Sequence, residues 1–255
     1  MKTLLLIGIG AGDPDYLTAQ AIAALNRAEV FFLLDKGPAK QALIAFREQV
    51  CQRYIDASRP YRFVEANSPE RERGGDYATR VEELNRAKQQ VFEQLIEQMA
   101  DGECGAFLVW GDPALYDSTS RILGAILAEG RLAFDFEVIP GISSVQALAA
   151  RHKVALNEIG QPVLITTGRR LLAQGVAAEG NTVVMLDAED SYLSLRGQGL
   201  EIYWGAYLGT PQEILMAGLL DEVGADIQRT RLAARAEHGW IMDTYLLRRP
   251  SPRSS

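Results

Sequence analysis

The sequence predicts an α/β fold built from two domains. In the first half of the chain, short apolar runs typical of buried strands alternate with amphipathic helical stretches. In the second half, strand candidates dominate and fewer helices separate them. Strands that alternate with helices favour crossover connections, so we expect a mostly parallel first sheet with helices on both faces. The second sheet is expected to be mixed or antiparallel.

Each element of the first half follows from its local pattern. A long amphipathic helix carries Val81, Leu84, Val91, Leu95 and Met99 close to helical spacing and stops at Gly102. The polar segment before it, residues 66–76, is rich in charge and glycine and is expected to be a surface loop. The remaining strands are expected at 4–7, 30–34, 62–65 and 106–110, and the remaining helices at 17–26, 40–54 and 121–127.

The pattern changes after the helix at 121–127. Strand candidates lie at 136–139, 163–166, 182–186, 202–207 and 240–247, with a helix at 145–151. We therefore expect an N-terminal α/β domain over residues 1–115, a C-terminal α/β domain over 116–249, and a disordered tail over 250–255.

Composition restricts the class of protein. The chain has 255 residues, of which 47% are hydrophobic and 23% charged, which is ordinary for a globular protein. A net charge of -7 argues against nucleic acid as a partner, because a basic surface supplies most of that affinity. No apolar run is long enough to span a membrane. Two cysteines without a metal-ligand spacing suggest a reducing, cytoplasmic location and no metal site.

A glycine-rich loop follows the first predicted strand. Residues 8–14 read Gly-Ile-Gly-Ala-Gly-Asp-Pro, so the glycines occupy relative positions one, three and five. A dinucleotide-binding fingerprint needs them at one, three and six. Position six is Asp13, whose carboxylate would repel a pyrophosphate in a partly dry site. The loop therefore favours a ligand without phosphates.

Two later loops also follow predicted strands. Residues 110–116 read Trp-Gly-Asp-Pro-Ala-Leu-Tyr, and residues 139–144 read Ile-Pro-Gly-Ile-Ser-Ser. Both loops lie at the carboxyl edge of the predicted sheet, where open α/β sheets bind ligands. Either loop alone is common turn chemistry. Their order and spacing after the first glycine loop resemble the tetrapyrrole (precorrin and uroporphyrinogen) methylases over nearly the whole chain.

That resemblance implies a two-domain methyltransferase that binds folded S-adenosyl-L-methionine in a cleft between the domains. No metal is implied, and relatives are commonly homodimers. Carried over by position, the residues implied to bind the cofactor are Gly111, Asp112, Leu115, Ser143, Ser144, Leu186, Tyr207 and, at a strand edge, His238.

Within the family, residues 30–37 and 238–245 resemble a subgroup of the aerobic cobalamin route. This implies methylation of precorrin-5 at ring carbon C-1 with loss of the acetyl group as acetate. A reduced tetrapyrrole is an electron-rich enamine, so methylation needs positioning and exclusion of water rather than a protein base. Acetate loss needs a proton-transfer or polarising group. The candidates are Asp13, Asp35, Tyr16 and Tyr116, although Asp13 equally suits a helix cap.

A polycarboxylate substrate needs a local basic rim in an acidic chain. We expect the substrate to contact Gly10 and Gly12 of the opening loop, together with Lys36, Arg59 and Arg62.

Three other functions stay open. One is a precorrin methylase acting at a different ring carbon. Another is an NAD-dependent Rossmann oxidoreductase, which Asp35 at the end of a second strand would suit. The third is a non-catalytic tetrapyrrole carrier.

Overall fold

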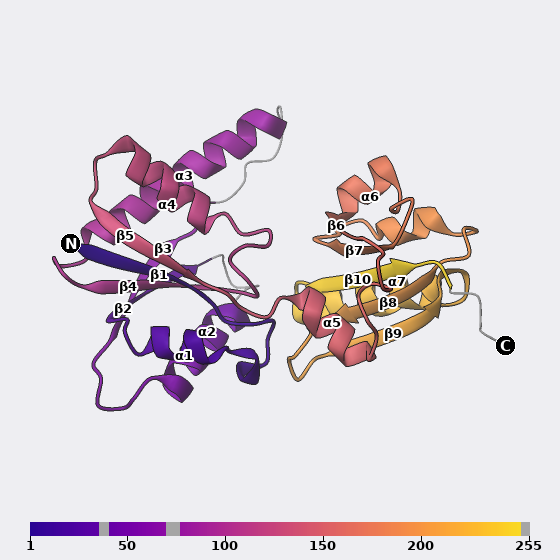
Figure 1. The fold of residues 1–255 in the computed structure, drawn as a ribbon, viewed down its shortest axis with the longest axis horizontal. Helices are drawn as coiled ribbons and strands as arrows, with labels where there is room; N and C mark the ends of the chain where they lie inside the picture. Colours follow the sequence, from indigo (N-terminus) through magenta and orange to yellow (C-terminus); the bar gives the residue numbers. More distant parts are fainter. Residues whose placement is uncertain (36–40, 70–76, 251–255) are drawn as a thin grey trace. The chain divides into compact units, whose positions relative to one another are not determined.

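The computed structural model describes residues 1–35, 41–69 and 77–250, and of these it leaves the side chains of 35, 41, 42 and 77–81 undescribed. The chain divides into two compact units, Met1–Ser143 and Ser144–Ser255 (Figure 1). Each unit contains a five-stranded sheet covered by helices. The α/β fold class expected from the sequence is confirmed.

The sheet of the first unit is parallel throughout. Its strand order is β3-β2-β4-β1-β5, so β1 pairs with β4 on one side and with β5 on the other. Because every strand runs the same way, the loops that follow the strands meet at one edge. The strands are β1 (Lys2–Gly8), β2 (Val30–Asp35), β3 (Arg62–Asn67), β4 (Cys104–Val109) and β5 (Phe134–Ile139).

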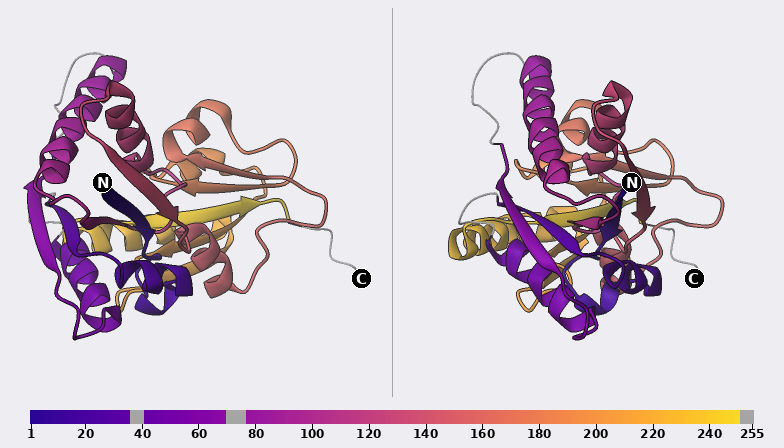
Figure 2. Two further views of the ribbon diagram at one scale, coloured as in Figure 1. Left: turned by 60° about the vertical axis from the view of Figure 1, so that its left-hand side comes forward. Right: turned by 90° about the vertical axis from the view of Figure 1, so that its left-hand side faces the viewer.

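Helices cover both faces of this sheet (Figures 1 and 2). The helices α1 (Ala19–Leu25) and α2 (Gln41–Tyr54) pack on one face, and α3 (Tyr77–Glu97) and α4 (Thr119–Glu129) on the other. The side chains of β1 alternate between the two cores: Leu5 and Ile7 join the first, and Leu4 and Leu6 the second. This double burial explains why the strand reads as one continuous apolar run.

The sheet of the second unit is mixed, as expected. Its order is β6-β7-β10-β8-β9, with β6 and β7 parallel and the remaining neighbours antiparallel. The strands are β6 (Val163–Thr167), β7 (Asn181–Met185), β8 (Glu201–Ala206), β9 (Ile214–Leu219) and β10 (Asp243–Arg248). The helices are α5 (Ser144–His152), α6 (Gly168–Gln174), the short 3-10 helix η3 (Ser191–Leu195) and α7 (Leu220–His238).

Helix α7 is the largest element that the sequence patterns did not predict. Its buried positions are Leu220, Gly224, Ile227, Arg231 and Ala234, which recur at helical spacing along one stripe. Two of the five are glycine and arginine, so the stripe does not read as apolar. The strand expected at 240–247 is observed at 243–248 as β10.

The boundary between the units lies later than expected. The sequence placed it between residues 115 and 116, whereas the structure places it between Ser143 and Ser144. After the Gly-Asp-Pro loop the chain still forms α4 and β5. Strand β5 then pairs with β1, with Ile139 beside Ile7. Both elements therefore belong to the first unit.

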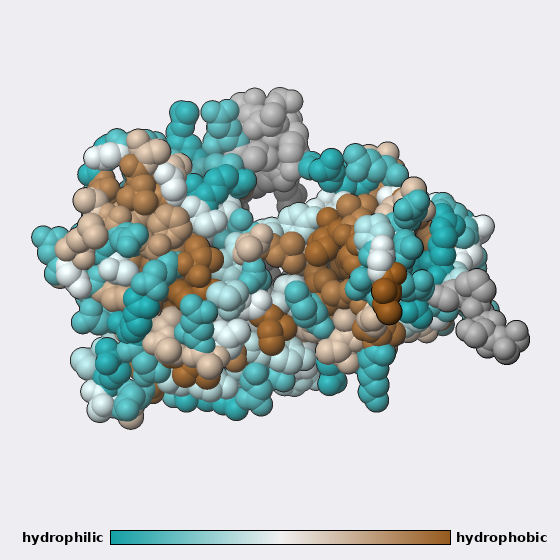
Figure 3. Space-filling view, viewed as in Figure 1, coloured by the Kyte–Doolittle hydropathy of each residue, from teal (hydrophilic) through white to brown (hydrophobic). Residues whose placement is uncertain are grey.

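The surfaces of both units mix charged and apolar side chains. Figure 3 shows brown apolar areas on this face of each unit, bordered by teal hydrophilic side chains. Among the described residues, no helix combines the length and the apolar character needed to cross a membrane.

Candidate functional site

In the first unit, three loops meet at the carboxyl edge of the sheet. They follow β4, β1 and β5, which are neighbours, and correspond to residues 110–116, 8–14 and 139–144. The sequence singled out all three loops, and the structure brings them together. We call this set of three loops the glycine junction.

Glycines allow the main chains of the glycine junction to touch. A Cβ atom on Gly141 would lie 2.2 Å from the carbonyl oxygen of Gly111 and 2.8 Å from Cα of Gly8. A Cβ on Gly8 would lie 2.6 Å from the nitrogen of Gly141. Real Cβ atoms do not approach main-chain atoms this closely, so both positions require glycine.

The first two loops also pair through their main chains. Gly10 and Gly111 form an isolated antiparallel bridge, in which the N–H of Gly111 donates to the oxygen of Gly10 at 2.8 Å. Both glycines have positive φ, +76° and +74° respectively, and Gly12 follows at +107°. These values lie in the left-handed region that side chains disfavour. The opening loop is therefore built onto the Gly-Asp-Pro loop.

Asp112 fastens the third loop. Its Oδ2 accepts a hydrogen bond from the N–H of Gly141 at 2.8 Å, and its Oδ1 accepts one from the N–H of Ala114 at 2.8 Å. Each carboxylate oxygen can accept a further donor. Leu115 and Tyr116 follow in the same loop, and the N–H of Leu115 donates to the main-chain oxygen of Asp112. Tyr116 is 48% exposed and has φ of +54°, an uncommon conformation for a non-glycine residue.

Asp13 and Asp35 are the two carboxylates proposed for acetate release, and the structure describes the side chain of Asp13 only. Oδ1 of Asp13 accepts a hydrogen bond from the N–H of Asp15 at 2.9 Å and caps the 3-10 helix η1 (Pro14–Tyr16). The helix that follows, α1, has its own cap in Thr18. Asp35 is the last residue of β2, beside Asn67 of β3, so its main chain lies at the carboxyl edge. Its side chain is outside the described part of the structure.

The expected basic rim is not assembled at the glycine junction by Arg59 and Arg62. Arg62 opens β3 and forms a bidentate ion pair with Glu103, which directly precedes β4. Both arginines therefore lie at or before the amino end of a strand, at the edge opposite the glycine junction. Their position could have been predicted from the sequence, because a residue that precedes a strand of a parallel sheet lies at the amino edge of that sheet. Lys36 lies outside the described residues.

In the second unit, several predicted residues gather at one edge of the sheet. Leu186 follows β7 and Tyr207 follows β8, and both strands flank the start of β10. The hydroxyls of Ser144 and Thr244 lie 2.9 Å apart, which joins the start of α5 to the start of β10. Ser143, the last residue of the first unit, is buried. Leu186 is 66% exposed with φ of +54°.

The structure places the side chains of Tyr207 and His238 within the packing of the second unit. The Tyr207 side chain is buried, its hydroxyl donates to the oxygen of Trp240, and its φ is +49°. His238 ends α7 instead of lying on a strand edge, because Gly239 closes the helix in a left-handed conformation. The two rings meet edge to face at 5.2 Å. Both side chains therefore pack with the fold of the unit.

A buried charge network holds the turn after β7. Asp187 accepts hydrogen bonds from Ser191 and from the hydroxyl of Tyr245 at 2.7 Å. Arg231 donates to the main-chain oxygen of Asp187 and to Oδ2 of Asp243 at 2.9 Å. Nη1 of Arg231 also lies 3.1 Å from Asp190. The network fixes the main chain next to Leu186.

Burial and charge act in opposite directions in this network. Burial raises the pKa of Asp243 above its usual value, against the attraction of Arg231. Burial would lower the pKa of Arg231, but Asp243, Asp190 and Asp187 together raise it. Burial, with the charge of Asp187, also raises the pKa of Tyr245. The aspartates therefore keep the guanidinium charged.

Comparison with known proteins assigns the family. A sequence profile of the Tetrapyrrole (Corrin/Porphyrin) Methylases matches residues 3–224. The chain belongs to this family. A deacetylating precorrin-6A synthase from a Sinorhizobium species is 46% identical over 251 residues, which cover 98% of this methylase and 96% of the relative.

Solved structures agree with this assignment. A cobalamin synthesis related protein from Corynebacterium diphtheriae matches with a TM-score of 0.81 and 37% identity, covering 98% of this chain and 100% of that one. A uroporphyrin-III C-methyl transferase from Thermus thermophilus, in complex with S-adenyl homocysteine, matches with a TM-score of 0.61 and 17% identity, covering 96% and 91%. At that lower identity the second match shows the fold alone.

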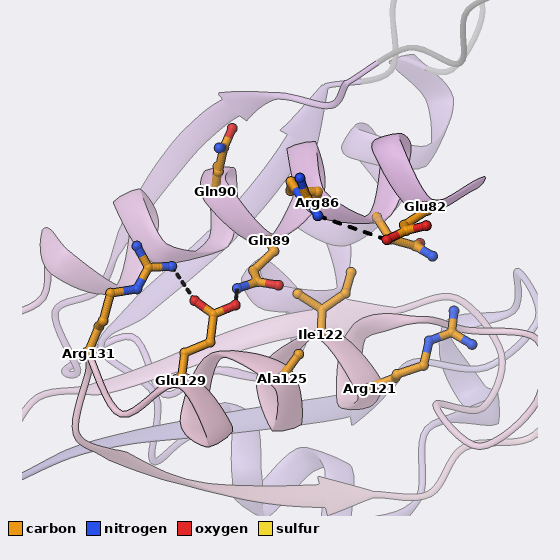
Figure 4. Close-up of a pocket in the computed structure, with 10 residues that line it drawn as sticks. Glu82, Arg86, Gln89, Gln90, Arg121, Ile122, Ala125, Glu129 and Arg131 are labelled. Atoms are coloured by element: carbon orange, nitrogen blue, oxygen red, sulfur yellow. Dashed lines mark hydrogen bonds and ion pairs between the residues drawn. The ribbon is translucent and has the colours of Figure 1, made fainter. Parts of the chain in front are cut away.

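The methylase also has a polar groove between α3 and α4 (Figure 4). Its volume is about 550 Å³, and none of the predicted site residues lines it. Arg131 and Gln89 both contact Glu129 inside the groove, so part of its charge is already paired. Among the described residues, no cluster of three or more histidine, cysteine, aspartate or glutamate side chains could hold a metal ion.

Proposed function

We propose that this methylase transfers a methyl group from S-adenosyl-L-methionine to ring carbon C-1 of precorrin-5 and releases the acetyl group as acetate, giving precorrin-6A. The observation that carries the proposal is the glycine junction, in which Gly8, Gly111 and Gly141 bring three main chains together at the carboxyl edge. The 46% identity to a deacetylating precorrin-6A synthase over almost the whole chain supports the choice of reaction.

The residues of the junction suit a cationic cofactor. When bound, S-adenosyl-L-methionine supplies an electrophilic methyl group on a sulfonium, and it carries an ammonium group as well. Asp112 has a lone pair left on each carboxylate oxygen beyond its two main-chain hydrogen bonds. A negatively charged acceptor of this kind favours a cation and disfavours a pyrophosphate. We therefore propose that Asp112 both fastens the junction and attracts the cofactor.

Further proposed cofactor contacts come from each unit separately. In the first unit they are the main chain of Gly111, together with Leu115 and Ser143. In the second unit, Ser144 and the exposed Leu186 are the strongest candidates, because both lie at the edge where β10 begins. The ring of Tyr207 is buried and its main-chain N–H already donates to Met242, so we propose that Tyr207 supports the site by fixing the main chain after β8. His238 packs on the ring of Tyr207 and helps to hold it in place.

Positioning supplies most of the rate of methyl transfer. The chain has to hold the nucleophilic ring carbon in line with the methyl group and keep water away. Well-oriented reactions gain about 7–11 kcal/mol in this way. No protein base is needed to activate an enamine carbon.

Acetate release needs proton chemistry that the chain must provide. Water adds to the acetyl carbonyl, and the bond between the carbonyl carbon and the macrocycle breaks. Its electron pair stays on the macrocycle, where it offsets the positive charge that the transferred methyl group brings. Acetate leaves, and the two protons of the water are released. We propose Asp35 as the first candidate for the group that orients this water, with Asp13 and Tyr116 as the others. Asp35 stands at the end of β2, at the same sheet edge as the glycine junction. An Asp35→Asn variant should methylate but release acetate slowly; release at the wild-type rate would remove Asp35 from the candidates.

Two measurements separate this proposal from its alternatives. Calorimetry should show binding of S-adenosyl-L-methionine and none of NAD, whereas an oxidoreductase would show the reverse. Incubation with precorrin-5 should yield a product methylated at C-1, together with acetate. A product methylated at another carbon, with its acetyl group retained, would indicate a different precorrin methylase. No turnover in the presence of both ligands would indicate a carrier.

We also propose that the methylase works as a homodimer in the cytoplasm. The two free cysteines, Cys51 and Cys104, suit a reducing compartment. Sedimentation equilibrium of the purified chain should give twice the monomer mass, and a monomer at micromolar concentration would contradict the dimer.

A further inference from the structure

Strands β2 and β4 separate at their carboxyl ends. They pair only through Val30–Phe32 and Gly105–Phe107. Beyond these residues β2 stays paired with β3 as far as Asp35, and β4 stays paired with β1 as far as Val109. The sheet is therefore split between β2 and β4 at the edge that carries the glycine junction.

Arg47 of α2 occupies this split. Its Nε donates a hydrogen bond to the carbonyl oxygen of Leu108 at 3.0 Å, and its Nη1 donates to the oxygen of Leu43 at 2.7 Å. Leu43 lies one helical turn earlier, so the side chain points back toward the amino end of α2. Because α2 follows β2 and returns along the sheet, that end lies at the carboxyl edge.

The helix is fixed against the Gly-Asp-Pro loop next to Arg47. The ring of Phe46 packs on the ring of Trp110, which begins that loop, with their centroids 5.0 Å apart. Phe46 belongs to the core that α1 and α2 share with the sheet. Arg47 is thus held by the same part of the fold that positions the candidate cofactor residues, and its placement does not depend on a surface loop.

The guanidinium is charged and partly desolvated. Burial lowers the pKa of Arg47 to about 10, against a smaller effect of the Asp117 carboxylate. Its two hydrogen bonds go to carbonyl oxygens, and among the described side chains no carboxylate lies within ion-pair distance. These two hydrogen bonds to described residues use two of the five N–H donors of the guanidinium. Burial disfavours the charged guanidinium, and an anion bound beside it would offset that cost.

We propose that Arg47 binds a carboxylate side chain of the tetrapyrrole substrate in the split between β2 and β4. This inference rests on the proposed function, because a tetrapyrrole of that class carries several carboxylates. It also replaces the role expected of Arg59 and Arg62, which lie at the opposite edge. A guanidinium fork suits such a carboxylate better than an ammonium does.

The test compares Arg47→Gln and Arg47→Lys with the wild-type enzyme on precorrin-5. Loss of a charged hydrogen-bonded contact should raise KM for precorrin-5 about 10- to 100-fold in Arg47→Gln, with kcat changed much less. Arg47→Lys should recover part of the loss, because it keeps the charge without the fork. The Kd of S-adenosyl-L-methionine should stay at its wild-type value in both variants.

The control is Arg27→Gln, which removes an exposed arginine that pairs with Glu137 in the same unit. It should leave both kinetic constants unchanged. The inference is overturned if folded Arg47→Gln keeps the wild-type KM, or if the variants weaken S-adenosyl-L-methionine instead, since that cofactor also carries a carboxylate. If Arg47→Gln does not fold, Arg47→Lys decides: a wild-type KM for it overturns the inference, and a raised KM with unchanged cofactor affinity supports it. A wild-type enzyme that does not turn over precorrin-5 would contradict the proposed function itself.

Discussion

The carboxylate of Asp112 accepts a hydrogen bond from the main-chain N–H of Gly141 at 2.8 Å, although 29 residues separate the two along the chain. This bond connects the Gly-Asp-Pro loop after β4 to the Pro-Gly loop after β5. Strand β1, which the opening glycine loop follows, lies between β4 and β5 in the sheet. The geometry of the glycine junction therefore depends on one side chain and on several glycines.

Asp112→Ala should weaken both the fold and the cofactor site. It leaves the N–H groups of Gly141 and Ala114 without their acceptor, at a cost of about 1–3 kcal/mol in the free energy of unfolding. Urea unfolding measures this loss, and calorimetry should show a raised Kd for S-adenosyl-L-methionine. Asp101→Asn, in an exposed turn, is the control. Unchanged affinity in Asp112→Ala would separate Asp112 from the cofactor.

Gly141→Ala should destabilise the protein by steric overlap alone. The added methyl group would lie 2.2 Å from the carbonyl oxygen of Gly111, and overpacking of this kind costs about 1–3 kcal/mol or more. The matched control is Gly124→Ala on the exposed side of α4, where a Cβ meets nothing within 4 Å. That change should stabilise by about 0.5–1 kcal/mol, because alanine favours a helix. Equal melting temperatures for the two variants would refute the close contact.

Arg231→Gln should be strongly destabilising, by about 3–5 kcal/mol, because it leaves buried carboxylates without their counter-charge. The free energy of unfolding in urea measures this effect. Arg229→Gln on the same helix removes an exposed ion pair with Asp226 and should change stability by less than about 1 kcal/mol. If the two variants unfold at the same urea concentration, the buried network does not hold the turn after β7.

Glu103 should contribute to the acid sensitivity of the first unit. Its hydrogen bonds with Arg62 lower its pKa below the usual 4.5. A lowered pKa in the folded state means that the contribution is present above pH 4.5 and is lost as the pH falls through the folded value. The stability difference between the wild type and Glu103→Gln should therefore shrink as the pH drops below 4.5. A difference that stays constant with pH would exclude this carboxylate.

The sequence predicted every strand except β9, together with the glycine loops, because their signals are local. The apolar run of β1 reflects burial on both faces of the sheet, and Gly10 and Gly111 mark main-chain conformations that other residues disfavour. The meeting of the loops then follows from the parallel order of the strands. The fold class and the glycine junction could therefore be predicted from residue patterns.

The remaining features depend on tertiary contacts. Helix α7 escaped prediction because its buried stripe includes Gly224 and Arg231, and the arginine is explained only by aspartates elsewhere in the second unit. Arg47 looks like an ordinary helix-surface charge until the split between β2 and β4 is seen. The ring of Tyr207 fills the core of the second unit, which its local sequence did not indicate.

The most direct measurement follows both products of the proposed reaction together. Precorrin-5 is incubated with the enzyme and S-adenosyl-L-methionine labelled with carbon-13 in its methyl group, and the tetrapyrrole product and acetate are analysed by nuclear magnetic resonance and mass spectrometry. The account predicts the labelled methyl group at ring carbon C-1 and one acetate released for each methyl group transferred. A label at another carbon, or methylation with the acetyl group retained, would contradict it.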